Sequence, residues 1–292
     1  MRKDLSTRII MILMMGLPLK LRRIVFKFLF LLFYHISLKH RMITISNLMR
    51  AFPEKDVTDL IVLAKGVYRH LGVVTAEMFE IPYLTQKKVY DFVDIEDPDN
   101  ILNALGREPY LIFTGHLGNW ELLAATLALL ARPISVIYRP LDNSILENLV
   151  SWIRTSKGNR ILPKDKAMRS ILRDLHENKM VGMLIDQNVT WQEGVFVDFF
   201  SQPACTTDGL ALIALHTDIP VIPVFMLRVP SGKYRLVVGS PVEIKKTGKK
   251  KEDVITNTEI FTGIIEEVVK KYPDQWLWIH QRWKTKKSQV QR

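Results

Sequence analysis

Hydrophobic and polar positions alternate along most of the chain with the periods of an α/β protein. Apolar residues recur at helical spacing through 57–79, and further helical stretches are predicted at 120–131, 144–157, 167–178, 208–216 and 252–271. Short apolar runs bounded by Gly, Pro or polar residues, typical of buried strands, occupy 110–114, 134–138, 181–186 and 221–226. Strands that alternate with helices predict an α/β fold with a central, mostly parallel sheet covered by helices.

The first 41 residues have a different pattern. Apolar runs at 9–19 and 24–38 are separated by cations, and no small-residue cleavage site follows them. Fifteen helical residues rise about 22 Å, less than the roughly 30 Å of a hydrocarbon core. We therefore interpret 1–41 as an uncleaved N-terminal membrane-anchor segment with a basic flank, which either spans the bilayer or lies in its interface. The alternative is a buried core helix with basic flanks. Residues 42–292 are predicted to form a single α/β domain.

The net charge of +11 is concentrated at the two ends of the 292-residue chain. Residues 1–41 hold nine Lys/Arg and one Asp, residues 279–292 hold five Lys/Arg and no acid, and the rest is close to neutral. Nucleic-acid binders spread cations over a folded face, whereas here the first basic segment is rich in Leu, Ile, Met and Phe. The distribution argues against nucleic acid and favours anionic membrane lipid as a partner, with the α/β domain on the cytoplasmic face.

Several site types lack their usual sequence support. The single cysteine, Cys205, excludes an internal disulfide, a CxxC pair and a multi-thiolate zinc site. The chain has no GxSxG, GxGxxG, GxxxxGK[ST] or HExxH motif, which weakens hydrolase, dinucleotide, NTPase and zinc-protease interpretations. No metal or bound cofactor is predicted.

The candidate chemistry lies directly after the first predicted strand of the sheet, in the segment TGHLGNWE at 114–121. Asn119 is a natural helix N-cap, which places Glu121 in the first helical turn and His116 in a Gly-flanked loop. The imidazole can then fold back onto the Glu121 carboxylate, as a base oriented by an acid. No Ser or Cys nucleophile lies beside it, so the proton would come from a substrate hydroxyl. The alternative is a capping turn with a core histidine, but the carboxyl end of a parallel strand favours a ligand site.

Over nearly its whole length the chain resembles the lipid A biosynthesis acyltransferases, the lauroyl and myristoyl transferases that acylate Kdo-lipid A precursors. The landmarks that carry the resemblance are Asn47-Leu48 with Phe52-Pro53-Glu54, the His116-x4-Glu121 signature, Tyr138-Arg139-Pro140, Arg154 near Gly158, Asp186-Gln187, Phe199-Phe200 with Thr206-Thr207, and Trp278-Ile279-His280 with Arg282-Trp283-Lys284. Their order and spacing together are specific to the family. One position departs from it, because Gln281 stands where the family commonly has an arginine, which puts a phosphate contact there in doubt.

The resemblance implies a glycerolipid-acyltransferase-like fold at the bacterial inner membrane. It implies transfer of an acyl group from acyl carrier protein, with no other cofactor, to a hydroxyl of a lipid A precursor. His116 would be the general base and Glu121 its orienting partner. Arg154 and Arg139 would bind acceptor phosphate or stabilise negative charge, and Asp186 and Asn119 would complete the substrate site.

Three other functions stay open at this point. They are an acyltransferase of another glycolipid or lysophospholipid that uses acyl-CoA, a thioesterase, and a catalytically silent lipid-binding membrane protein. Trp276, Trp278 and Trp283 are predicted to be structural or interfacial, and Cys205 to be an inert buried thiol. The lysine-rich segment 245–251 is a solvated loop or an attractor of acyl carrier protein.

Overall fold

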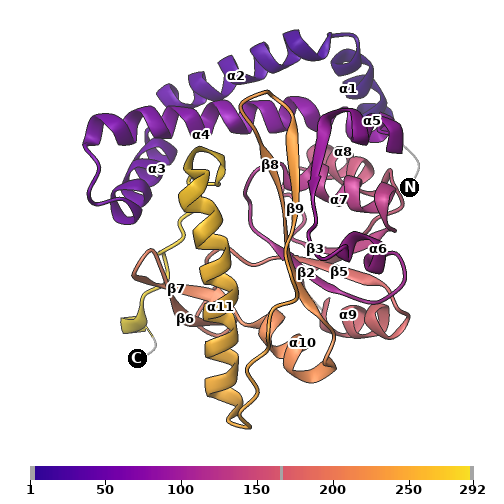
Figure 1. The fold of residues 1–292 in the computed structure, drawn as a ribbon. Helices are drawn as coiled ribbons and strands as arrows, with labels where there is room; N and C mark the ends of the chain where they lie inside the picture. The colour runs from indigo at the N-terminus through magenta and orange to yellow at the C-terminus, as the bar shows by residue number, and fades with distance from the viewer. Residues whose placement is uncertain (1–3, 165–166, 290–292) are drawn as a thin grey trace.

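The computed structural model describes residues 4–164 and 167–289. Figure 1 shows a sheet enclosed by helices, with further helices stacked along one end. The helices are α1 (Leu5–Met15), α2 (Leu19–Ile36), α3 (Leu38–Ala51), α4 (Val57–Met78), α5 (Gln86–Phe92), α6 (Ile101–Leu105), α7 (Trp120–Leu130), α8 (Ser144–Thr155), α9 (Ala167–His176), α10 (Gly209–Thr217) and α11 (Lys250–Lys271). The strands are β1 (Val93–Glu96), β2 (Leu111–Thr114), β3 (Ile134–Tyr138), β4 (Arg160–Pro163), β5 (Met180–Leu184), β6 (Gly194–Phe199), β7 (Gln202–Thr207), β8 (Val221–Arg228) and β9 (Tyr234–Val238).

The central sheet has the strand order β1-β9-β8-β2-β5-β3-β4. Strands β8, β2, β5, β3 and β4 are parallel, as the alternation of strands and helices predicts. Strand β9 is antiparallel to β8 because a tight turn joins them, in which the Val229 N–H donates to the Lys233 carbonyl and Gly232 has a φ of +83°. Strands β6 and β7 form a separate antiparallel hairpin. The sequence pattern did not predict β1, β4, β9 or this hairpin.

Successive residues of a strand point to opposite faces of the sheet, and helices cover both faces. On one face Ile112 of β2 packs in a core with residues of α7 and α8. On the other face Leu111 and Phe113 pack in a core with α9, α10 and α11. This arrangement confirms the predicted α/β class and brings the carboxyl ends of the parallel strands together at one edge.

The N-terminal helices lie against the α/β body at one end of the molecule (Figure 1). Helix α2 runs along α4 so closely that a Cβ atom at Gly72 would lie 2.7 Å from the Phe26 carbonyl oxygen. Arg22, 1% exposed, pairs with Glu80, and Arg23 binds Glu77 at 2.6 Å, so two of the cations expected in a membrane flank tie α2 to the fold. The proposed domain boundary at 41 stays a prediction, and that position lies inside α3.

The outer sides of these helices expose large apolar side chains: Leu5, Ile9, Ile12, Leu13, Leu21, Ile24, Phe28, Leu29, Leu32, Phe33, Ile36, Leu38, Met42 and Met49. Arg8, Lys20, Lys27 and Lys39 are exposed among them. Among the residues described, no helix has both the length and the apolar content needed to cross a membrane.

Candidate active site

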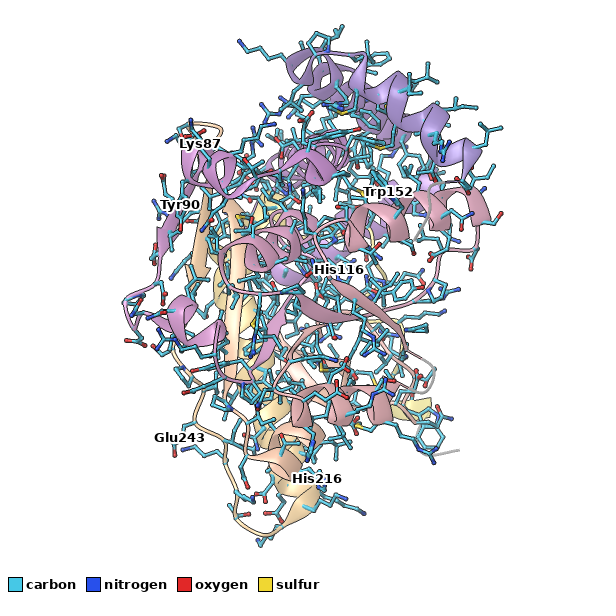
Figure 2. All side chains as sticks on the ribbon, turned by 90° about the vertical axis from the view of Figure 1, so that its right-hand side faces the viewer. Lys87, Tyr90, His116, Trp152, His216 and Glu243 are labelled. Carbon is cyan, nitrogen blue, oxygen red and sulfur yellow. The ribbon has the colours of Figure 1, made fainter. Side chains whose placement is uncertain are left out.

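The loop between β2 and α7 carries His116 (Figure 2) and is fastened to β8. The Asn119 N–H donates to the Met226 carbonyl at 2.8 Å, and Gly118 has a φ of +62°. A Cβ atom at Gly118 would lie 2.0 Å from the Met226 carbonyl oxygen, so glycine is required there. Asn119 caps α7 as predicted, because its Oδ1 accepts a hydrogen bond from Leu122 N at 3.0 Å.

His116 is oriented by Asp186, which follows β5, the strand next to β2 in the sheet. The Nδ1 atom of His116 lies 2.8 Å from Oδ1 of Asp186, and the His116 backbone N–H donates to Oδ2 at 2.7 Å. The Asp186 side chain is 1% exposed, whereas that of His116 keeps 22%. An ionised carboxylate only accepts hydrogen bonds, so the network assigns the proton to Nδ1 and leaves a lone pair on Nε2.

The prediction that Glu121 orients His116 is therefore wrong. Glu121 accepts hydrogen bonds from Arg154 Nε at 2.9 Å and Nη2 at 2.5 Å, and from Trp120 Nε1 at 3.1 Å. A guanidinium offers two parallel donors and a permanent charge, which an imidazole cannot match. Burial acts to raise the pKa of Glu121, but the charge and hydrogen bonds of Arg154 outweigh it and the pKa is lowered.

Asp186 has a third hydrogen bond, from the C-terminal segment of the chain. Trp276, 1% exposed, donates its Nε1–H to Oδ2 of Asp186 at 2.7 Å. Burial acts to raise the pKa of Asp186, yet the attraction of His116 and the hydrogen bonds from His116 and Trp276 lower it to about 2. Asp186 thus stays ionised and is hydrogen-bonded to His116, which corrects its predicted place among the substrate-binding residues.

The same C-terminal segment fixes the residues after Asp186. The fully buried Arg282 donates to the carbonyl of Gln187 at 3.3 Å and to that of Cys205 at 3.0 Å. His280 accepts the Asn188 N–H on its Nε2 at 2.8 Å, and burial lowers the pKa of His280 to about 4 against the attraction of Asp186. His280 and Arg282 are among the family landmarks, but the sequence alone assigns them no part in the site.

The three C-terminal tryptophans are structural, and their interfacial interpretation is wrong. Trp276, Trp278 and Trp283 are each at most 3% exposed and pack in the core. Cys205 is buried as predicted, and burial raises the pKa of its thiol. Within the described ranges, no group of three or more His, Cys, Asp or Glu is placed to hold a metal ion.

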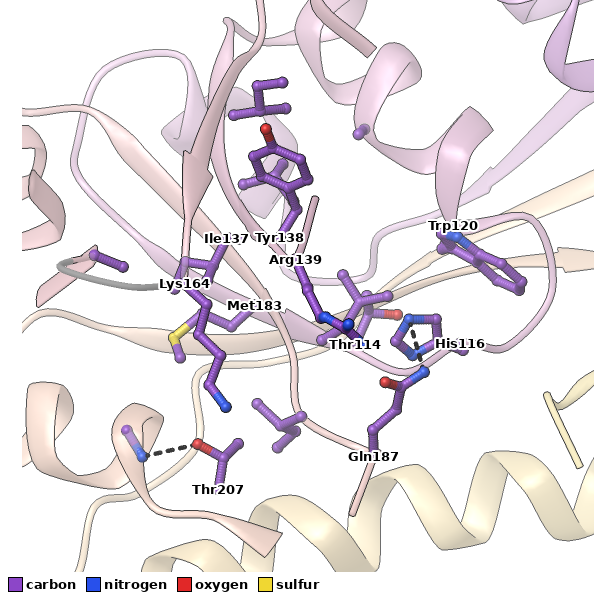
Figure 3. A pocket seen from close by; sticks show the side chains of 18 of the residues that line it. Thr114, His116, Trp120, Ile137, Tyr138, Arg139, Lys164, Met183, Gln187 and Thr207 are labelled. Carbon is purple, nitrogen blue, oxygen red and sulfur yellow. Dashed lines mark hydrogen bonds between the residues drawn. The ribbon is translucent and has the colours of Figure 1, made fainter. Parts of the chain in front are cut away.

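A cavity of about 820 Å³ opens beside His116 (Figure 3). Its polar part includes Gln187, Arg139, Lys164 and His280. One apolar part lies on the sheet face that α7 covers, and its lining includes Ile112, Leu123, Leu127, Ile134, Val136 and Gly182. Residues on the other face of the sheet, among them Ile137, Ile171, Met183 and Ile213, also line the cavity. His116 therefore lies where polar and apolar parts of the cavity lining meet.

The structure places the other predicted substrate-binding residues in different environments. Arg154 lines the cavity but is engaged by Glu121. Arg139 also lines it, with a side chain 79% exposed that pairs with Asp142 at 3.1 Å. Asn119 is 1% exposed, and its amide donates to Tyr234 and Glu77, so the structure makes it a buried capping residue, which corrects its predicted role.

A family model described as bacterial lipid A biosynthesis acyltransferase matches residues 6–285. The chain belongs to this family. A lipid A biosynthesis palmitoleoyltransferase from Escherichia coli (strain K12) is 25% identical over 82% of this chain and 77% of its own length. A lipid A biosynthesis lauroyltransferase from the same strain is 23% identical over 84% of this chain and 79% of its own length. A phosphatidylinositol mannoside acyltransferase from Mycolicibacterium smegmatis is 26% identical over 51% of this chain and 50% of its own.

Among solved structures, the 1-acyl-sn-glycerophosphate acyltransferase PlsC from Thermotoga maritima aligns with a TM-score of 0.40 and 16% identity, over 89% of this chain and 99% of its own. Membership of the lipid A acyltransferase family makes acyl transfer in lipid A biosynthesis the activity class to which this site belongs.

Proposed function

We propose that this lipid A acyltransferase moves a fatty acyl chain from acyl carrier protein to a hydroxyl of a lipid A precursor, with His116 as the general base. The observation that carries the proposal is the hydrogen bond of 2.8 Å between His116 Nδ1 and the buried Asp186 carboxylate, beside a cavity with apolar walls. A base oriented by an acid, with no nucleophile next to it, is suited to activate a hydroxyl for direct attack on a thioester.

The reaction proceeds through a tetrahedral intermediate. His116 Nε2 takes the proton of the acceptor hydroxyl while the hydroxyl oxygen bonds to the thioester carbon, and the π electrons of the carbonyl move to its oxygen. The carbonyl then re-forms, the carbon–sulfur bond breaks, and the imidazolium returns the proton to the thiolate. Asp186 holds the imidazole in the productive tautomer and stabilises its charged form.

The cavity supports a lipid substrate. Its volume of about 820 Å³ lies within the range typical of small-molecule sites, and many of its lining side chains are aliphatic. The apolar part below α7 gives an acyl chain room next to the base, and the exposed Arg139 and Lys164 at the polar part can meet an anionic headgroup.

We further propose that α1, α2 and α3 attach the enzyme to the cytoplasmic face of the bacterial inner membrane. Their exposed apolar side chains and exposed cations, among them Arg8, Lys20, Lys27 and Lys39, suit an anionic interface. Helix α2 is fastened along α4 by Arg22 and Arg23, so its exposed face can enter the headgroup region without the helix leaving the fold.

The lysine-rich segment 245–251 is the weaker candidate for binding acyl carrier protein. Lys245, Lys246 and Lys249 form ion pairs with Glu243, Asp218 and Glu252 at 2.7, 2.9 and 3.2 Å. Glu243, at the edge of this segment, lies far from His116 in Figure 2. We therefore treat the segment as a solvated loop and propose that the carrier protein approaches at the cavity entrance.

The test is a reconstituted reaction. The full chain is incubated with acyl-loaded carrier protein and a lipid A precursor, and the products are analysed by mass spectrometry. We expect a mass increase of the precursor by one acyl group that depends on His116. Release of free fatty acid without acceptor dependence would instead identify a thioesterase. Transfer from acyl-CoA to a lysophospholipid or another glycolipid would replace the substrate assignment. No turnover with any donor would favour a silent lipid-binding protein.

A cellular measurement complements the reaction in vitro. Lipid A from cells with and without the gene is compared by mass spectrometry, and the mass difference gives the acyl chain length. Identical lipid A profiles would overturn the acceptor assignment.

A further inference from the structure

The side chain amide of Gln187 faces the working nitrogen of the base. Its Nε2 lies 3.3 Å from His116 Nε2, the contact drawn as a dashed line in Figure 3. Because Asp186 accepts a hydrogen bond from Nδ1–H, His116 Nε2 carries a lone pair, and only the donor end of the amide can face it favourably. The resting site therefore holds an N–H donor where the reacting groups must enter.

The chain on both sides of this amide is rigidly held. The Gln187 carbonyl accepts from the buried Arg282, and the next residue, Asn188, donates its N–H to His280. The Gln187 side chain is only part-buried and lines the cavity. A fixed backbone with a side chain free to adjust within the cavity is the arrangement that a substrate-contacting donor needs.

Of the two arginines expected to stabilise negative charge, Arg154 is held by a carboxylate, and Arg139 is largely exposed to solvent. Arg154 directs Nε and Nη2 to Glu121, and Arg139 pairs with Asp142. The amide of Gln187 is instead directed at the base itself. A hydroxyl that is hydrogen-bonded to His116 Nε2 attacks the thioester carbon from close by. The carbonyl oxygen of that thioester then comes within a few ångströms of the Gln187 amide.

We propose that Gln187 is a catalytic residue that donates an amide N–H to the thioester oxygen as it becomes an oxyanion, which rests on the proposed acyl transfer. The incoming hydroxyl displaces the amide from the lone pair of His116. When the oxygen–carbon bond forms and the proton passes to Nε2, the displaced N–H donates a hydrogen bond to the new oxyanion. This hydrogen bond is lost when the carbonyl re-forms and the carbon–sulfur bond breaks. A donor aimed at charge that exists only in the transition state raises kcat without tightening substrate binding.

Replacement by a side chain of similar length without a donor tests the role. We expect Gln187→Met to lower kcat on the order of 10²- to 10³-fold, with KM for donor and acceptor changed only a few-fold. Gln192→Met, the same change at an exposed position on the following loop, serves as the matched control and should keep full activity. A Gln187→Met enzyme that melts like the wild type and keeps kcat within threefold would overturn the proposal.

A second variant checks that this side chain lies beside the base in the working enzyme and covers the case in which Gln187→Met fails to fold. The titratable groups near His116 are Asp186, Glu121 and His280. Gln187→Glu adds a carboxylate next to Nε2, which stabilises the imidazolium, so the acid limb of the kcat profile should move to higher pH. An unshifted acid limb would contradict the proposal. If the wild-type enzyme transfers no acyl group under the same conditions, the proposed function itself fails, and that result is distinct from an active wild type with indifferent variants.

Discussion

Arg154 of α8 holds the Glu121 carboxylate of α7 through two nitrogen atoms, at 2.9 and 2.5 Å. The side chains are 25% and 9% exposed, so water reaches the pair only in part. Both residues also line the cavity. The ion pair therefore joins two helices and at the same time shapes the wall beside His116.

We predict that Glu121→Gln lowers the free energy of unfolding by about 2 kcal/mol, less than a fully buried pair would lose because solvent screens Arg154. Denaturant unfolding measures the change. The double variant Glu121→Leu/Arg154→Met removes both charges and should recover most of the loss. Single and double variants of equal stability would show that the pair does not hold α7 to α8.

Asp186→Asn should lower kcat on the order of 10³- to 10⁴-fold while the protein stays folded. The amide can still accept from Trp276 and the His116 backbone through its oxygen, but its NH₂ group then faces Nδ1 and forces the proton onto Nε2, where the base must be empty. Steady-state acyl transfer measures the loss. Asp198→Asn, the same change at an exposed position of β6, is the control. Near wild-type turnover in Asp186→Asn would exclude the imidazole as the base.

The place of the candidate site could be read from the sequence, but the hydrogen-bond partner of His116 could not. The run at 110–114 and the cap at Asn119 identify a strand, a loop and a helix, and local rules suffice for these. Local spacing favours Glu121 as the orienting partner because it lies five positions from His116. Asp186 lies 70 positions away and meets His116 only because β5 pairs with β2, and strand order is not encoded in local periodicity.

The C-terminal contribution was hidden for a related reason. Trp276, His280 and Arg282 lie beyond α11 in a segment with little regular structure, where indoles among cations look interfacial. Their burial depends on contacts with Asp186, Asn188 and the β7 strand, all distant in sequence. Likewise, the N-terminal sequence shows that this segment is hydrophobic but not which side of α2 faces the protein. The ion pairs of Arg22 and Arg23 with Glu80 and Glu77 show which side packs inward.

Stability should depend on His280 between pH 6.5 and pH 4. Burial lowers the pKa of His280 to about 4 in the folded protein, so the unfolded chain binds more protons in this window and stability falls as pH falls. The contribution amounts to about 3 kcal/mol once pH is below 4. His280→Gln keeps an acceptor for the Asn188 N–H and should show a shallower loss of unfolding free energy from pH 7 to pH 4.

The matched control for that measurement is His216→Gln, on an exposed position of α10. It removes an ionisable imidazole that the fold does not bury, so its pH dependence should follow the wild type. The interpretation of His280 would be wrong if its variant lost stability with the same slope as the wild type and His216→Gln.

Membrane attachment through α2 predicts a graded effect of its exposed apolar residues. Ile24 and Phe28 are 62% and 64% exposed, and burying each in an interface contributes on the order of 1–2 kcal/mol. Ile24→Ser should weaken binding to anionic vesicles about tenfold, and Ile24→Ser/Phe28→Ser about 100-fold, in co-sedimentation assays. Neither variant should lower the unfolding free energy, because neither side chain is buried.

Ile255→Ser supplies the matched control, because this isoleucine is 41% exposed near the start of α11, at the opposite end of the molecule from α2 (Figure 1). Its vesicle binding should equal that of the wild type, since the start of α11 faces away from the proposed interface. Equal weakening by Ile24→Ser and Ile255→Ser would mean that general surface hydrophobicity, and not the face formed by α1, α2 and α3, drives attachment. The electrostatic part of the attraction is assigned to Arg8, Lys20, Lys27 and Lys39, so high salt should weaken vesicle binding. Binding that depends on α2 but not on anionic lipid would support the attachment face and contradict this electrostatic part.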